Sequence, residues 1–501
     1  MKKTRILALV MALAMSATAF TGCSGNEGSG SETSGGGDDN NSGEVTKLSW
    51  YGIGDTTTAG FNDSLVEVNK YLKEKLNVEL DWIITGWNDY ETKFNTMVNG
   101  GDYFDIMFAS NVYYSRFVSK GAFMDITEKV KTAAPDLYEF VPENLWEGVS
   151  INGKVYGVPT YKDSSLTQFW YFDHDKVEKY NIDVKSVKTM DDLDPIFYQV
   201  KEGEEAETGE TFYPVYLTQG NPWNGFFNDF DDLCSGVGAI GVRIDDENRK
   251  VVNVLDDEEV LHNLDLLHKW FNDGIINQDA NVSNESYKQC FFGSGQGWPS
   301  AVIGWAAGQN LKQYDATDPI DGPFYTSATT QGSINCLYAN CKNPEVALKF
   351  LELVNTDNKL RDMLTYGKEG VDFEYQTTDD DRTVLHQITT DNYKGPASYA
   401  IGSFFSLSLR DTEPATQWDE IKQQNEEAVD SVCMGFTLDT SNIETEITAC
   451  ASEWATYKAD MLTGARDPKE LVPELKERLK SAGIDTIIAE AQKQVDAYFS
   501  K

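Results

Sequence analysis

The segment from residue 45 to residue 109 alternates between strand and helix patterns, and this alternation restricts the possible folds most strongly. Residues 45–51 predict a strand that ends in the loop 52–55. Residues 78–84 carry apolar side chains at every second position, which predicts a second strand. Apolar residues also recur at spacings of three and four, as on one face of a helix, at Phe61, Leu65, Val68, Leu72 and Leu76. A strand, a helix and a strand in this order form a parallel pair with a right-handed crossover.

The rest of the chain continues with helices and strands. A helix over 89–98 ends at Gly100-Gly101, and 104–109 reads as a third, buried strand, so this region is α/β. Residues 151–172 predict extended chain leaving one lobe for another, and residues 239–255 predict a hairpin. Five further helices are predicted, over 260–271, 344–354, 453–463, 468–482 and 484–499.

The N-terminus carries a processing signal. Lys2, Lys3 and Arg5 precede an uncharged apolar run over 6–20, which is too short to span a bilayer. The sequence around Gly22 and Cys23 resembles the bacterial lipobox, in which cleavage leaves a cysteine that receives diacylglycerol. We therefore expect a signal peptide over 1–22, a lipidated Cys23 and a disordered tether over 23–43, rich in Gly, Ser, Asn and Asp. The alternative is a plain secreted protein with an incidental cysteine.

Composition excludes some partners. The formal net charge of −39 opposes binding to phosphate backbones, so we expect no nucleic-acid partner. Aromatic residues make up 12% of the chain, a high share that is frequent in secreted proteins that handle sugars. The six cysteines beyond Cys23 form no CxxC pair or Cys/His cluster that would suggest a metal site, and both disulfides and buried free thiols stay open for them.

Several stretches together resemble a known family. They are the lipobox and tether, "GKVYGVP", a hairpin with "VRIDDENRKVVN", "WFNDGII", "NPEVALKFLELVNTD" and the C-terminal "GFTLDTSNIETEITACASEWATYKADMLTG". This order is similar to that of the extracellular solute-binding proteins of bacterial ABC importers, in the sugar-binding family 1. The C-terminal stretch, together with "LTYGKEGVDFEY", resembles a lipoprotein subgroup often called LipO- or LplA-like.

The resemblance implies a fold and a function. The fold would be an α/β, two-lobe clamshell of the type II periplasmic-binding-protein kind, with a helical C-terminal region. One lobe would hold 44–160 plus 299–370, and the other 161–298 plus 371–501. A lipid-anchored monomer outside the cytoplasm would capture a carbohydrate, expected to be an oligosaccharide, and deliver it to ABC permease subunits. Only its anchor would touch the membrane.

Candidate ligand-binding residues follow from the chemistry of sugars. Aromatic rings lie against the apolar face of a sugar, and carboxylates and amides bind its hydroxyls. In two-lobe folds the binding loops follow the carboxyl ends of strands. These criteria select Trp50, Tyr51, Asp55, Trp87, Asn88, Asn111, Tyr113, Tyr114, Trp223, Trp298 and Glu369. For each residue at a strand end, core packing is an equally good interpretation. Trp82 and Trp270 are expected in the core.

Catalytic and cofactor motifs are weak or missing. Residues 236–241 match G-x-G-x-x-G, but an acidic segment precedes them and a hairpin follows, so we expect a glycine-rich turn and no cofactor. The four histidines form no H-E-x-x-H, and no G-x-S-x-G is present. We expect no enzyme, although a surface glycosidase or lyase, or the same fold binding a peptide or other solute, remains an alternative.

Overall fold

The first sheet is mixed, with parallel pairing around β1 and antiparallel pairing around β14. We describe the protein from a computed structural model, which covers residues 44–500 except 55–57, 235, 286–289 and 310; the expected signal peptide, tether and Cys23 lie outside the described residues. The strand order is β2-β1-β3-β14-β6. These strands are β1 Thr46–Ile53, β2 Val78–Thr85, β3 Ile106–Ala109, β14 Ile334–Leu337 and β6 Gly157–Pro159. β1 pairs in parallel with both β2 and β3, which confirms the predicted β-α-β unit.

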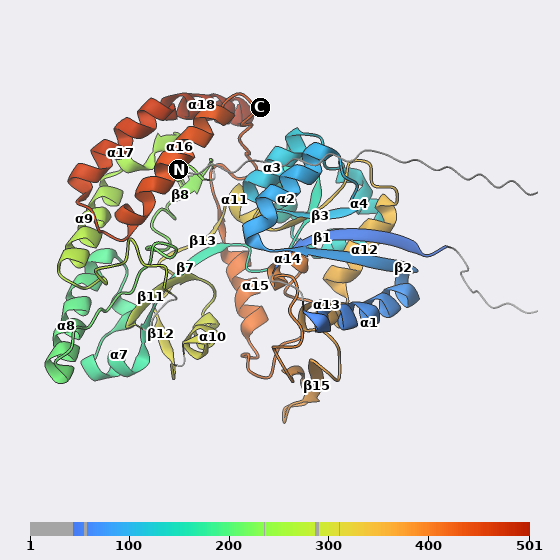
Figure 1. The fold of residues 1–501 in the computed structure, drawn as a ribbon, viewed down its shortest axis with the longest axis horizontal. Helices are drawn as coiled ribbons and strands as arrows, with labels where there is room; N and C mark the ends of the chain where they lie inside the picture. Colours follow the sequence, from blue (N-terminus) through green and yellow to red (C-terminus); the bar gives the residue numbers. More distant parts are fainter. Residues whose placement is uncertain (1–43, 55–57, 235, 286–289, 310, 501) are drawn as a thin grey trace, which may run out of the picture. The chain divides into compact units, whose positions relative to one another are not determined.

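Helices cover this sheet because their apolar stripes need a partner surface. The helix between β1 and β2 ends at Asn77, whose φ of 54° gives the left-handed cap. The helices are α1 Ala59–Leu76, α2 Trp87–Gly100, α3 Asn111–Ser119, α4 Thr127–Ala133, α5 Pro135–Phe140, α6 Glu143–Gly148, α12 Pro344–Thr356, α13 Asn358–Tyr366 and α14 Ser398–Ile401. Figure 1 shows α1 and α2 in blue beside β1 and β2. One continuous hydrophobic core joins these elements, and Trp82 is buried in it as expected.

A second sheet has the order β11-β7-β13-β17, with β12 also paired to β7. Its strands are β7 Leu166–Asp173, β11 Phe292–Gln296, β12 Tyr314–Ala316, β13 Asp321–Tyr325 and β17 Val429–Asp430. Beside it, β9 Ile240–Arg243 pairs with β10 Val252–Asn253, which confirms the predicted hairpin, and with β8 Phe230–Asp232. Gly236 and Gly238 have positive φ and precede β9 rather than a helix, so the glycine-rich segment is a turn.

The second core collects the C-terminal helices. α16 Glu444–Leu462, α17 Pro468–Ala482 and α18 Ile484–Phe499 confirm the predicted helical region, and α17 packs on α9 Glu258–Asn272 (Figure 1). Trp270 on α9 is fully buried there, as predicted. The remaining elements are β4 Ser150–Ile151, β5 Lys154–Val155, α7 His174–Tyr180, α8 Met190–Thr208, α10 Ala301–Gly308, α11 Ser327–Thr330, α15 Gln417–Glu427, β15 Phe373–Thr377 and β16 Thr383–Gln387.

The packing differs from the predicted lobe boundaries at two places. β12 and β13 hydrogen-bond to β7, so residues 314–325 belong to the second sheet rather than to the first lobe. Phe373, Leu385 and Ile401 are fully buried in the first core, although their segment was assigned to the second lobe. The sequence pattern of a strand or helix does not show on which sheet the element packs, so these two departures from the predicted boundaries could not be read from the sequence.

Three segments connect the two sheets. They lead from β6 to β7, from β13 through α11 to β14, and from α14 to β17. The segments brace one another: the Thr160 amide donates to the Ser333 carbonyl at 3.0 Å, and the Ser165 amide donates to Asn425 Oδ1 at 3.1 Å. Multiple adjacent crossings of this kind are suited to hinge motion between two rigid bodies.

Candidate functional site

Two adjoining cavities lie along the elements that connect the sheets. The larger cavity has a volume of about 590 Å³ and is lined by the loop 220–230, β13, α11 and α16. The smaller cavity has a volume of about 310 Å³ and is lined by α3, which packs in the first core, and by β8, α11 and the start of α16. Asp232 and Ala328 line both cavities. Together they offer a binding volume in the range of small-ligand and oligomer sites.

The larger cavity is rich in aromatic side chains. Its aromatic lining residues are Trp223, Phe226, Phe227, Phe230, Phe324 and Trp454. Trp223 is buried and stacks on Phe292 with ring centroids 5.2 Å apart, so it forms a fixed base. Phe226, Phe227 and Phe324 are half-buried and therefore retain accessible ring surface.

Amides and hydroxyls accompany these rings. Asn221, Asn224 and Asn228 come from the same loop, and Thr326 and Thr329 from the start of α11. Asn228 Nδ2 donates to Asp321 Oδ2 at 3.2 Å. Burial, with a contribution from the nearby Asp229, raises the pKa of the Asp321 carboxyl to about 7. Flat apolar faces beside hydrogen-bonding groups of both polarities match the surface of a sugar.

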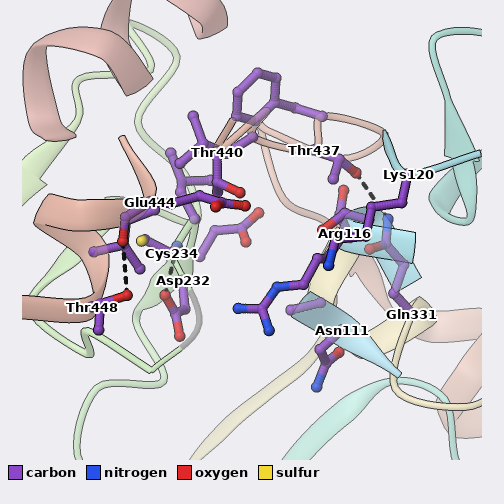
Figure 2. Close-up of a pocket in the computed structure, with 18 residues that line it drawn as sticks. Asn111, Arg116, Lys120, Asp232, Cys234, Gln331, Thr437, Thr440, Glu444 and Thr448 are labelled. Carbon is purple, nitrogen blue, oxygen red and sulfur yellow. Dashed lines mark hydrogen bonds between the residues drawn. The ribbon is translucent and has the colours of Figure 1, made fainter. Parts of the chain in front are cut away.

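The smaller cavity is more polar, and charged groups stand on both of its sides. Figure 2 shows Arg116 of α3 and Lys120, which directly follows α3, opposite Asp232 and Glu444. Asp232 reaches the cavity surface, yet the surrounding protein desolvates its carboxylate and raises its pKa to about 6. Asp231 beside it is 1% exposed, and burial raises the pKa of its carboxyl to about 7.

The sequence-predicted residues fall into three groups. Asn111 lines the smaller cavity and Trp223 the larger one. Trp87 is 51% exposed at the carboxyl end of β2, where its side chain hydrogen-bonds Tyr399, and Asn88 beside it is exposed. These four stand at or near surfaces that a ligand can reach.

The others lie elsewhere. Trp50 is 1% exposed and stacks on Trp82, and Tyr114 is fully buried with its hydroxyl donating to the Val149 carbonyl at 2.6 Å. Both have the core-packing role that the sequence left open. The remaining residues line neither cavity: Tyr51 and Tyr113 are half-buried against the first core, Trp298 is half-buried, and the exposed Glu369 forms an ion pair with Lys359 at 3.2 Å. Asp55 lies outside the described residues.

Sequence reasoning missed most of the lining. The run from Asn221 to Asp232 alternates amides, aromatics and carboxylates around the one residue that was selected, Trp223. That density of ring and amide side chains in a loop was the available signal. Arg116 and Phe324 carried no signal, because only the fold brings α3 and β13 to the cavities.

The described residues carry no sign of a metal centre or a membrane span. In this part of the chain, no group of three or more His, Cys, Asp and Glu side chains could hold a metal ion. None of the described helices is long and apolar enough to cross a bilayer. The six described cysteines are buried free thiols.

Comparison with known families defines the class of protein. Residues 68–370 match the family model described as bacterial extracellular solute-binding protein, and residues 432–500 match a domain of unknown function, DUF3502. The chain therefore belongs to the bacterial extracellular solute-binding protein family, and its α/β fold is that of substrate-binding proteins.

Particular relatives are similar over nearly the whole chain. A carbohydrate ABC transporter substrate-binding protein of Streptococcus pneumoniae is 28% identical, over 91% of this chain and 92% of the relative. The solved N-glycan transport solute binding protein (NgtS) of the same organism is 27% identical, with a TM-score of 0.79 over 91% of this chain and 99% of that one. Its complex with Man5GlcNAc has a TM-score of 0.71, with the same identity and shares.

Proposed function

We propose that this protein captures an oligosaccharide in the two adjoining cavities and delivers it to an ABC permease for import. The observation that carries this proposal is the larger cavity, in which half-buried phenylalanine rings stand among asparagine and threonine side chains. The relatives support it, because their names assign them to carbohydrate and N-glycan transport. The chain acts as a monomer that binds and releases its ligand without chemical change.

Capture combines ring stacking with movement of the two sheets. A sugar laid against Phe226 or Phe324 loses water from its apolar face, while neighbouring amides bind its hydroxyls. Bending of the connecting segments then closes α3 toward β8 over the ligand, and the permease receives the closed form. The exposed Trp87 offers a further ring at the edge of the first sheet.

A thermal-shift screen tests the ligand class. We expect neutral oligosaccharides to raise the melting temperature, peptides to leave it unchanged, and the sugar to be recovered intact by mass spectrometry. If a peptide stabilises the protein and no glycan does, the ligand is a peptide or another solute and not a sugar. Release of shorter sugars would indicate a glycosidase or lyase instead.

A matched pair of variants locates the binding rings. Phe226→Ala removes a ring of the larger cavity, and Phe212→Ala removes an equally half-buried ring that lines neither cavity. We expect Phe226→Ala to weaken binding about 10-fold, since a ring contact of this kind contributes about 1–2 kcal/mol. Equal affinities for the two variants would show that the ligand lies elsewhere.

We also propose that Cys23 anchors the protein through a lipid, with residues 24–43 as the tether. The support is the lipobox-like sequence before Cys23 and the polar composition after it. Cys23→Ser should release the protein from cell membranes into the medium and leave ligand affinity unchanged. A Cys23→Ser variant that stays with the membrane fraction would contradict the anchor.

A further inference from the structure

Three buried oxygen atoms without hydrogen-bond partners belong to residues that line the smaller cavity. They are Asn111 Oδ1, Asp231 Oδ2 and Ser327 Oγ, none of which has a partner among the described residues. Asp231 is 1% exposed and Ser327 is 7% exposed. An unsatisfied buried polar atom costs about 1–3 kcal/mol, so three around one cavity suggest a role in ligand binding.

The three oxygens come from separate parts of the fold, and each is held in place. Asn111 begins α3 with a φ of 44°, and its amide donates to the Gln331 carbonyl at 2.7 Å. Asp231 is fixed in β8, where it pairs opposite Val242 of β9. Ser327 is the first residue of α11, directly after its cap Thr326.

The chemistry of this set favours hydrogen-bond donors on the ligand. The amide oxygen and the carboxylate accept, the serine hydroxyl can do either, and the carboxylate of Asp232 stands on the same wall as Asp231. On the opposite wall, Lys120 Nζ donates to Asn99 Oδ1 at 2.9 Å, and Arg116 stands over the Tyr113 ring at 5.7 Å. The buried groups therefore call for hydroxyl or N–H donors. A ligand carboxylate on the β8 wall would meet Asp231 and Asp232, which are both ionised above about pH 7, while Lys120 and Arg116 opposite are engaged by Asn99 and the Tyr113 ring.

We infer that the smaller cavity is a subsite that binds one neutral sugar unit of the ligand through its hydroxyl or acetamido N–H donors, and that it rejects a sugar unit bearing a carboxylate. This inference rests on the proposed function and specifies which sugars the site takes. Because Asn111 begins α3, which packs in the first core, and Asp231 lies on β8, which packs in the second, a sugar held by both also links α3 to β8.

The decisive variant is Ser327→Ala, with Ser64→Ala as its control. Ser64 on α1 is likewise a buried serine whose Oγ has no described partner, but it lines neither cavity. Removing an unpaired buried hydroxyl should leave stability unchanged or raise it, so we expect both variants to melt at or above the wild-type temperature. Calorimetry with the oligosaccharide from the screen should show about 5–10-fold weaker binding for Ser327→Ala alone.

Acidic analogues test the rejection of carboxylates. Two uronic acid forms of the same oligosaccharide are compared, one oxidised at one end and one at the other. One of the two should bind at least about 10-fold more weakly than the neutral oligosaccharide. At about pH 8, where both aspartates are ionised, Asp231→Asn should reduce that loss, because one of the two repelling carboxylates is gone.

Each outcome decides between the claims. If the wild-type protein binds no oligosaccharide, the proposed function fails and the subsite with it. If it binds one but Ser327→Ala and Ser64→Ala bind equally well, only the subsite is refuted. Uronic forms that bind as tightly as the neutral sugar at both ends would overturn the donor preference.

Discussion

Replacing Arg361 with methionine should strongly destabilise the protein, although Arg361 lines neither cavity. The side chain is fully buried on α13. Its guanidinium donates to three main-chain carbonyls, those of Ser398 at 2.7 Å, Ser403 at 3.0 Å and Gly402 at 3.2 Å. It thereby holds the segment that carries Tyr399, the hydrogen-bond partner of Trp87.

The magnitude follows from the carbonyls left without donors. Each buried acceptor that loses its partner costs about 1–3 kcal/mol. Burial lowers the pKa of Arg361 to about 10, because the charged guanidinium is desolvated at a cost in free energy. Removing the charge removes that cost, which offsets part of the destabilisation. We expect a net decrease of about 3–5 kcal/mol in the free energy of unfolding, in line with the loss of one member of a buried charged network.

Urea unfolding followed by tryptophan fluorescence measures this change, and a thermal melt should fall by about 1 °C per kcal/mol for a unit of this length. Arg382→Met is the control, because Arg382 is exposed and forms an ion pair with Asp380 at the surface. The control should change stability little. An Arg361→Met protein as stable as the control would refute the reasoning.

Two further predictions concern the cavity walls. The pKa values of Asp231 and Asp321 in the folded protein are near 7, well above the usual value of an aspartate carboxyl, so the folded state binds their protons more tightly than the unfolded state does. Protonation of these two carboxyls therefore stabilises the folded state fully below about pH 4, and this contribution is lost as the pH rises through about 7. The melting temperature should be higher at about pH 5.5 than at about pH 7.5. Asp231→Asn should reduce this difference in melting temperature. Gly238 has a φ of 58°, and a Cβ there would lie 2.5 Å from the Trp454 indole. Gly238→Ala should therefore lower the free energy of unfolding by about 1–3 kcal/mol. Because the Trp454 indole would be displaced, calorimetry should also show weaker sugar binding. Unchanged affinity would show that Trp454 does not contact the sugar.

Much of the fold could be predicted because long periodic segments are unambiguous. The stripe on α1, the alternation on β2 and the last two C-terminal helices each identified an element within a few residues, whereas α16 begins at Glu444, ahead of the predicted start at residue 453. The strand-end rule was less informative for side chains. β1 is a central parallel strand covered on both faces, so Trp50 enters the core although it stands near a strand end.

The site was harder to predict than the fold. Trp223 stood out in its loop, but Phe324 and Arg116 reach the cavities only because the fold brings β13 and α3 beside that loop. Contacts between residues far apart in sequence leave no local pattern. The unsatisfied oxygen of Ser327 likewise becomes visible only when its surroundings are known.

The most direct test of the central claim is a calorimetric titration of neutral oligosaccharides into the purified protein, followed by mass spectrometry of the sugar. The account predicts saturable binding of at least one oligosaccharide at one site per chain, with the sugar unchanged afterwards. Absence of binding across neutral oligosaccharides, or release of shorter fragments, would contradict it.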